Sequence, residues 1–382
     1  LRRYRAQVRT HSAEEAAHLV RPQIEVSRLL PERLAIKTVT LSPVGDAIYL
    51  NCWKRDDEVW RLDTSTYRIG FDGRAAIEAH LRHERARRSE DERDASRDEE
   101  EVPFSGEVRR LHLPVGAAVT AVSPDGGRLL VTHQARDNRL YTQADLWLID
   151  ARAALDAPHD ATCLAGMQNI SAPLDRLVME SYWTQSGIYG WYVDGAVVRV
   201  ARFGEQGEIT PLDFGGLFPL QGFDVTEAGE IGFVATNAER FPELYVARRT
   251  GAGPEYEARA LSDYGRATRG WDLGRVETIR WTSQDGVEIE GVLRTPTTFD
   301  PAKRYPLAVV VHGGPRWYSA AYLLTGYDLN YYPAVQFTHE EVLVLSPNYR
   351  GSLGRGQAFA ELNVDNLGVG DLWDLESAIE HL

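Results

Sequence analysis

The first 270 residues repeat one arrangement of apolar and polar positions. In each copy, a Ser-Pro-x-Gly-like turn leads into an apolar strand, and a polar loop separates it from a second strand that carries an aromatic residue. The clearest copy has the turn Ser123-Pro124-Asp125-Gly126 and predicts strands at 128–132 and 145–150. Proline presets the first turn position and glycine accepts positive φ, so each copy predicts an antiparallel hairpin. The other copies predict paired strands at 47–50 and 58–63, at 176–179 and 190–193, and at 231–234 and 243–246.

Four such units predict a β-propeller. A small antiparallel sheet cannot bury both of its faces alone, whereas radially stacked sheets cover one another. The turns at Ser123, Ser171 and Thr226 recur at roughly the 40–50 residues of one blade. Because four blades are few for a closed ring, we expect further blades before the given sequence or within residues 1–31. A β-sandwich with Ser-Pro turns is the alternative.

A charged insert at about 74–101 interrupts the first of these units. It contains neither glycine nor proline after Arg74, and opposite charges stand three and four residues apart. This pattern predicts a solvated helical excursion from the propeller, with a partner-binding arm as the alternative.

The pattern changes after Arg275. Residues 276–281 alternate like a strand, Gln284-Asp285-Gly286 predicts a turn, and 287–293 predict the returning strand. Two continuously apolar segments, 305–311 and 342–346, are typical of strands that are buried on both faces of an α/β sheet. An acidic segment at 371–380 predicts a helix. We therefore place a domain boundary near 275, with the propeller at 1–275 and a second domain at 276–382.

Two polar loops follow the apolar segments. His312-Gly313-Gly314-Pro315 comes after the first, and Asn348-Tyr349-Arg350 comes after the second. Loops at the carboxyl ends of strands form the sites of open α/β sheets, and glycines let backbone N–H groups approach a ligand. His312, Tyr349 and Arg350 are candidates to line such a site. Pairing of Arg350 with a carboxylate and a plain tight turn at the glycines are the structural alternatives.

Together, residues 284–292, 305–315, 346–359 and the acidic helix resemble the prolyl oligopeptidase family of serine peptidases, and most closely its acylaminoacyl-peptidase and dipeptidyl-peptidase branch. The resemblance implies a propeller followed by an α/β-hydrolase domain, of which 276–382 are the N-terminal portion. It also implies hydrolysis of short peptides or acyl-amino acids through an acyl-enzyme. In that reading Gly313 and Gly314 supply oxyanion-hole N–H groups, with Gly314 favoured, and His312 has a structural or lining role.

The Ser–Asp–His triad that the resemblance implies is not recognisable. No Gly-x-Ser-x-Gly elbow occurs, and the nearest match, around Ser352, has Arg350 in place of the first glycine. We therefore expect no catalytic residue in this chain, a triad beyond Leu382, and no activity of the chain alone. The alternatives are a non-catalytic propeller binding module with a degenerate hydrolase remnant, and an esterase or amidase on the same fold.

Composition narrows the choice of partners. With 42 basic and 56 acidic residues, the net charge of -14 argues against nucleic acid. No apolar run is long enough to predict a membrane span. The only cysteines, Cys52 and Cys163, predict reduced thiols in a cytoplasmic protein. The acidic run at 56–58 lacks the glycine spacing of a calcium loop, so we expect no metal and no cofactor. Short peptides are the expected substrates, and the sequence leaves open whether the protein forms a homo-oligomer.

Overall fold

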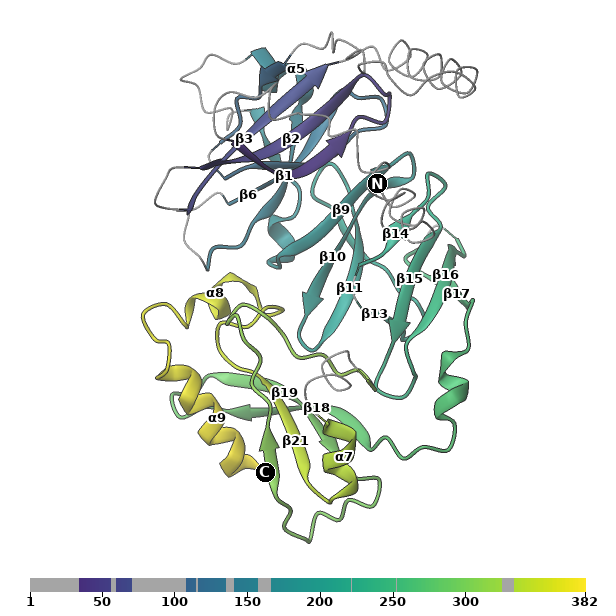
Figure 1. Ribbon diagram of the computed structural model, residues 1–382, viewed down its shortest axis with the longest axis vertical. Coiled ribbons are helices and arrows are strands. Elements are labelled where there is room, and N and C mark those ends of the chain that lie inside the picture. The colour runs from purple at the N-terminus through teal and green to yellow at the C-terminus, as the bar shows by residue number, and fades with distance from the viewer. Residues whose placement is uncertain are drawn as a thin grey trace, which may run out of the picture.

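The computed structural model describes residues 34–55, 60–70, 108–114, 116–134, 141–156, 166–220, 222–251, 253–324 and 333–382. The predictions for residues 1–31, the charged insert at 74–101, the acidic run at 56–58 and Cys163 lie outside these ranges. Figure 1 shows a series of small sheets, purple to green, followed by a separate sheet with yellow helices.

Four antiparallel sheets of consecutive strands make up the part before residue 270. Sheet 1 contains β1 (Leu34–Leu41), β2 (Ala47–Arg55), β3 (Trp60–Gly70) and β4 (Val108–Arg110). Sheet 2 contains β5 (Ala118–Val122), β6 (Arg128–His133), β7 (Asp145–Asp150) and β8 (Gln168–Asn169). Sheet 3 contains β9 (Val178–Thr184), β10 (Gly187–Asp194), β11 (Val197–Phe203) and β12 (Ile209–Pro211). In sheet 4, β13 (Phe218–Pro219) and β14 (Asp224–Val225) both pair with β15 (Ile231–Thr236), and β16 (Glu243–Arg249) and β17 (Tyr256–Ala260) follow. The short helices are α5 (Ala151–Asp156), η2 (Ala172–Leu174) and η3 (Tyr264–Thr268).

All four strand pairs expected from the repeat are present, and most of the strands run further than the apolar runs that predicted them. The turn between β5 and β6 shows why the repeat forms a hairpin. The Ser123 amide donates to the Arg128 carbonyl at 2.9 Å, the Ser123 hydroxyl reaches Asp125 at 2.6 Å, and Gly126 has φ +76°. The turn residues therefore fix the register of β5 and β6, in which Val122 pairs with Leu129.

The sheets pack face to face in chain order. Tyr49 of sheet 1 and Val119 of sheet 2 share one apolar cluster, Leu130 of sheet 2 and Ile188 of sheet 3 share the next, and Trp191 and Phe233 join sheets 3 and 4. Polar contacts add to this packing, because the fully buried Asn51 side chain bonds both the amide and the carbonyl of Val119, at 3.0 and 2.8 Å. Over the described residues the four sheets form an open series, and no closed ring is present.

A mixed sheet, sheet 5, follows. It contains β18 (Arg275–Thr282), β19 (Glu288–Thr295), β20 (Leu307–Val309) and β21 (Leu343–Asn348), in the order β18-β19-β21-β20. The predicted hairpin is β18–β19, while β21 runs antiparallel to β19 and parallel to β20. The accompanying helices are α7 (Ala334–His339), α8 (Gly356–Glu361) and α9 (Gly370–His381).

One strand prediction is wrong in its extent and its burial. Residues 305–311 were expected to form a strand buried on both faces, but β20 has three residues, all half-buried, and Val311 is 44% exposed. The reason is position, because β20 lies at the edge of sheet 5 with β21 as its single neighbour in the described sheet. The helix expected at 371–380 is present as α9, whose Ala378 packs with Trp281 and Ile289.

Candidate functional site

The Gly313–Gly314 loop begins where β20 ends. The Val310 amide still bonds the Leu345 carbonyl at 2.8 Å, after which the chain leaves the sheet. Both glycines are exposed, and within the described residues neither amide donates to a protein acceptor. Gly314 has φ +130°, and a Cβ there would lie 2.9 Å from the Arg316 nitrogen, whereas a Cβ on Gly313 would meet nothing within 4 Å. Glycine is therefore required at 314 and is replaceable at 313.

His312 lies under this loop against Tyr349. The two rings stack with centroids 4.7 Å apart and planes 22° apart. Nε2 of His312 is 3.0 Å from the Ser352 hydroxyl, and Nδ1 is 3.1 Å from the Gly313 carbonyl oxygen. Burial lowers the pKa of His312, so the ring is neutral at neutral pH. With both nitrogens directed at protein atoms, His312 is placed to support the loop.

Tyr349 supports the same loop from the end of β21. Its hydroxyl donates to the His312 carbonyl at 2.8 Å. Burial raises the pKa of Tyr349 to about 12, so the phenol keeps its proton and remains a donor. The structure thus brings together three of the residues that the sequence singled out: His312, Gly313 and Tyr349.

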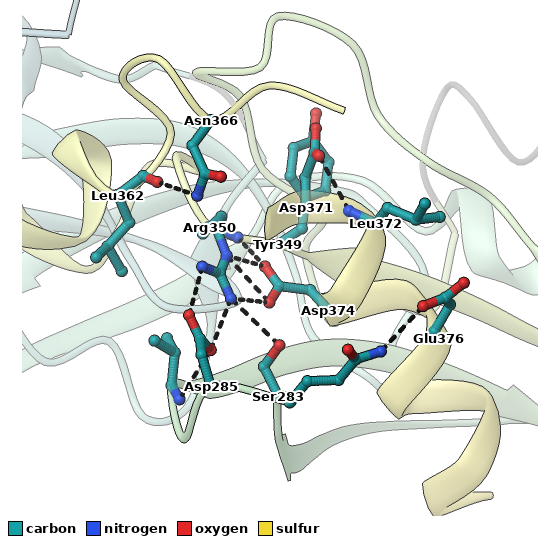
Figure 2. A network of polar contacts seen from close by, with 12 residues as sticks. Ser283, Asp285, Tyr349, Arg350, Leu362, Asn366, Asp371, Leu372, Asp374 and Glu376 are labelled. Carbon is teal, nitrogen blue, oxygen red and sulfur yellow. Dashed lines mark hydrogen bonds and ion pairs between the residues drawn. The ribbon is translucent and has the colours of Figure 1, made fainter. Parts of the chain in front are cut away.

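Arg350 points the other way, into the protein (Figure 2). Its side chain is 2% exposed and binds Asp374 of α9, which is 0% exposed, and Asp285 of the β18–β19 turn. The guanidinium nitrogens lie 2.8 Å from an oxygen of each carboxylate, and the Arg350 amide donates to Asp374 at 2.8 Å. These bonds raise the pKa of Arg350 and lower that of Asp285. Arg350 therefore joins three segments beneath the site, which is the structural alternative stated above for this residue.

No sequence pattern indicates the polar contacts that hold sheet 5 against sheets 1–4, which together are called the four-sheet body. Gln357 of α8 accepts from the Gln143 amide at 2.7 Å and donates to the Tyr141 carbonyl at 3.1 Å. Arg316, directly after the glycine loop, donates to the Thr142 carbonyl at 3.3 Å. Residues 141–143, in the connection between β6 and β7, thus lie beside the glycine loop.

A second set of contacts comes from the segment after Arg316. The Tyr322 hydroxyl donates to the Pro219 carbonyl at 2.8 Å and accepts from the Val198 amide at 3.0 Å. The Leu323 amide donates to the Asn237 carbonyl at 2.8 Å. Nothing in the sequence of this segment predicted a partner in sheets 3 and 4.

Metal-ligand clusters and membrane-spanning helices are the remaining features to consider among the described residues. No group of three or more His, Cys, Asp or Glu side chains is placed to hold a metal ion in that part of the chain. None of its helices has the length and apolar character needed to cross a membrane.

Solved structures of known proteins share this arrangement of strands and helices. The acylaminoacyl peptidase of Pyrococcus horikoshii matches 92% of this chain with a TM-score of 0.63 at 19% identity, and a puromycin hydrolase matches 91% with a TM-score of 0.58 at 19% identity. The chain shares the fold of these two solved enzymes over the part that it covers. It spans 46% of the length of either solved chain.

Sequence comparison agrees with this fold. A probable dipeptidyl-peptidase 5 of Emericella nidulans is 31% identical over 104 residues, which are 27% of this chain and 13% of that protein. No model of a known protein family matches the chain. The proteins that this chain resembles are thus peptidases.

Proposed function

We propose that the protein is a serine peptidase of the prolyl oligopeptidase type that hydrolyses short peptides or acyl-amino acids. In this proposal sheets 1–4 are blades of a β-propeller and residues 276–382 are the first part of an α/β-hydrolase domain. Four meanders packed in chain order, followed by a mixed sheet with flanking helices, support that division. The buried Cys52 thiol, whose pKa burial raises to about 11, fits the reducing cytoplasm that we propose as its location.

The observation that carries the proposal is the pair of exposed amides at Gly313 and Gly314. They follow a strand that runs parallel to its neighbour, at the edge of the sheet where α/β enzymes place their sites. Acyl transfer passes through a tetrahedral oxyanion, and fixed N–H donors lower its free energy without reorganisation. Gly314 is our choice for the principal donor, because its backbone is held in a conformation that other residues rarely adopt.

The neighbouring body supports a restriction to small substrates. Residues 141–143, between β6 and β7, lie against α8 and Arg316, so the four-sheet body lies next to the glycine loop. In this proposal the body limits access to Gly314 and disfavours folded protein chains as substrates. Short peptides and acyl-amino acids are therefore the substrates that we propose.

Ser352 is not suited to be the nucleophile. Ser352 is the nearest to His312, but it is 1% exposed, and its hydroxyl lies 2.6 Å from the Tyr349 carbonyl. We therefore propose that the 382 residues alone turn over no substrate and that the triad is supplied outside them.

The test compares two preparations: the 382 residues, and the protein expressed from its natural reading frame, whatever that frame encodes. Each is assayed on acetyl-alanine p-nitroanilide, Ala-Ala p-nitroanilide and p-nitrophenyl acetate, and labelled with a fluorophosphonate. We expect amide hydrolysis and serine labelling in the second preparation and neither in the first. Hydrolysis of the ester alone favours an esterase, and the absence of labelling in both preparations refutes a serine hydrolase.

A backbone substitution tests the assigned donor. Glycolic acid incorporated at position 314 replaces the N–H by an ester oxygen and keeps the residue free of a side chain. Loss of one oxyanion donor should lower kcat about 10²–10³-fold with little change in KM. The same replacement at Gly313 is the matched control, and equal losses at both positions would show that Gly314 is not the principal donor.

A further inference from the structure

A pocket of about 90 Å³ lies between β11 of sheet 3 and the segment that leads into β13 of sheet 4. β12 pairs with residues 201–203 of β11, so the residues before them have no strand partner on that side. The pocket occupies the space beside this unpaired part of β11. Its apolar walls are side chains that are at most 7% exposed: Val198, Val200, Leu212, Phe214 and Leu217.

Hydrogen bonds hold the two sides of the pocket in place. The Tyr322 hydroxyl accepts from the Val198 amide at 3.0 Å and donates to the Pro219 carbonyl at 2.8 Å. The Leu212 amide donates to the Val200 carbonyl at 2.8 Å. Because these bonds fix the backbone on both sides, the space is present before any ligand binds. Little reorganisation is then needed to fill it, which favours binding of a small molecule.

Arg199 brings a positive charge to the pocket lining. Its Nε donates to Asp194 at 2.9 Å, and its guanidinium carbon lies 5.5 Å from the centroid of the Phe218 ring. Within the described part of the chain its Nη1 and Nη2 atoms make no hydrogen bond, and the side chain is 37% exposed. The guanidinium is thus held in place with two nitrogen atoms still able to donate, as a carboxylate ligand requires.

Asp213 brings a negative charge to the same lining. Its amide donates to the Pro254 carbonyl at 3.0 Å, its carbonyl accepts from the Tyr256 amide at 2.8 Å, and its Oδ1 accepts from the Gly215 amide at 2.9 Å. Oδ2 accepts no hydrogen bond from the described residues, and Asp213 is exposed. A fixed carboxylate with a free oxygen suits an ammonium group.

We propose that this pocket binds a free α-amino acid whose aliphatic side chain has about three or four carbons, such as valine or leucine. The side chain enters between the apolar walls, Arg199 binds the carboxylate, and Asp213 binds the ammonium group. The size follows from the volume, because a cavity of about 150 Å³ holds benzene and this one is smaller. A zwitterion pairs with both charges of the lining. The proposal does not depend on the proposed peptidase function.

Methyl spectra can detect this binding without any turnover. The protein expressed from its natural reading frame is labelled at its Val and Leu methyl groups, assigned by single conservative substitutions, and titrated with unlabelled L-valine. We expect the signals of Val198, Val200, Leu212 and Leu217 to shift, with a Kd on the order of 1 mM for so small a ligand. Phenylalanine is too large for the pocket and should leave these signals in place.

Two analogues of valine each lack one of its charges. N-acetylvaline has no ammonium group, and valinamide has no carboxylate. Each should bind about tenfold more weakly than valine, because one charge-assisted hydrogen bond is lost.

Two variants test the charged residues separately. Arg199→Gln should abolish the preference for valine over valinamide and keep the preference over N-acetylvaline, and Asp213→Asn should do the reverse. Asp224→Asn and Arg248→Gln are the matched controls, since both residues are exposed in sheet 4 and neither lines the pocket. Both controls should bind valine as the unmodified protein does.

Three results would overturn the proposal. The first is methyl signals that stay in place at valine concentrations far above the expected Kd. The second is equal affinity for valine, N-acetylvaline and valinamide, which would show an apolar cavity that recognises neither charge. The third is a loss of binding in the controls as large as in Arg199→Gln and Asp213→Asn.

Discussion

Replacing Arg350 by alanine should destabilise the C-terminal part of the protein more than any exposed ion pair does. The guanidinium is 2% exposed and holds two carboxylates, of which Asp374 is 0% exposed. In Arg350→Ala the Asp374 carboxylate stays buried, and the backbone amide of residue 350 still donates to it at 2.8 Å. A charge stranded in this way is the main cost, because the attraction that offset its desolvation is gone.

The size of the effect follows from burial. Removing one partner of a buried ion pair costs about 3–5 kcal/mol. In a domain of 150–250 residues each 1 kcal/mol lowers Tm by roughly 2–4 °C, so the transition that involves α9 should fall by about 6–20 °C. The matched control is Arg269→Ala, since Arg269 is 71% exposed and pairs with Asp263 at 3.2 Å. An exposed pair of this kind contributes about 1 kcal/mol or less.

Hydrogen exchange followed by mass spectrometry measures the loss locally, in peptides from α9 and β18, and a thermal scan measures it globally. A double variant sharpens the reasoning. If the stranded carboxylate is the main cost, Arg350→Ala with Asp374→Ala should be more stable than Arg350→Ala alone. Protection of α9 that is unchanged in Arg350→Ala, or a double variant less stable than the single one, would refute the argument.

Three further predictions concern the glycine loop, the contact between sheets 1 and 2, and pH. Gly314→Ala should destabilise the protein by about 1–3 kcal/mol through its positive φ, while Gly313→Ala stays within about 0.5 kcal/mol, and equal urea midpoints would contradict this. Asn51→Ala leaves the Val119 amide without its side-chain acceptor, so the free energy of unfolding should fall by about 1–3 kcal/mol and the amides of β5 should exchange faster. Unchanged exchange would show that the hydrogen bond between Asn51 and Val119 does not stabilise the contact between sheets 1 and 2. Burial lowers the pKa of His133, so the unfolded chain binds its proton first and stability falls as pH drops through about 6.5. His133→Gln should flatten that decline in denaturation experiments between pH 7.5 and 5.5, and an identical slope would show that other groups cause it.

The strands were predictable from sequence because their signals are local. Alternation of apolar residues and a Ser-Pro-Asp-Gly turn act over fewer than ten neighbouring positions, and Val122 opposite Leu129 follows once the turn sets the register of β5 and β6. Burial was less predictable. An apolar run does not say how many neighbours a strand has, which is why β20 was expected to be buried and is an edge strand with Val311 exposed.

Some residues of the candidate site were predictable from the sequence and others were not. The glycine loop and Tyr349 were recognisable because motif and strand end coincide in the sequence. The partners of Arg350 were not, because Asp285 is 65 residues away and becomes its neighbour only when the hairpin and α9 pack. Ser352 was dismissed as a false elbow, yet its hydroxyl lies 3.0 Å from Nε2 of His312, a contact that no sequence pattern indicates.

The contacts between the four-sheet body and sheet 5 end largely on main-chain atoms of the body. Gln357 bonds the Tyr141 carbonyl, Tyr322 bonds the Pro219 carbonyl, and the Leu323 amide bonds the Asn237 carbonyl. Every amino acid presents the same carbonyl, so mutations that accumulate in those loops leave the attachment intact as long as the backbone path is kept. The sequence of the four-sheet body can therefore change faster than that of residues 276–382. A chimera that joins a foreign body of the same backbone geometry to residues 276–382 should still assemble.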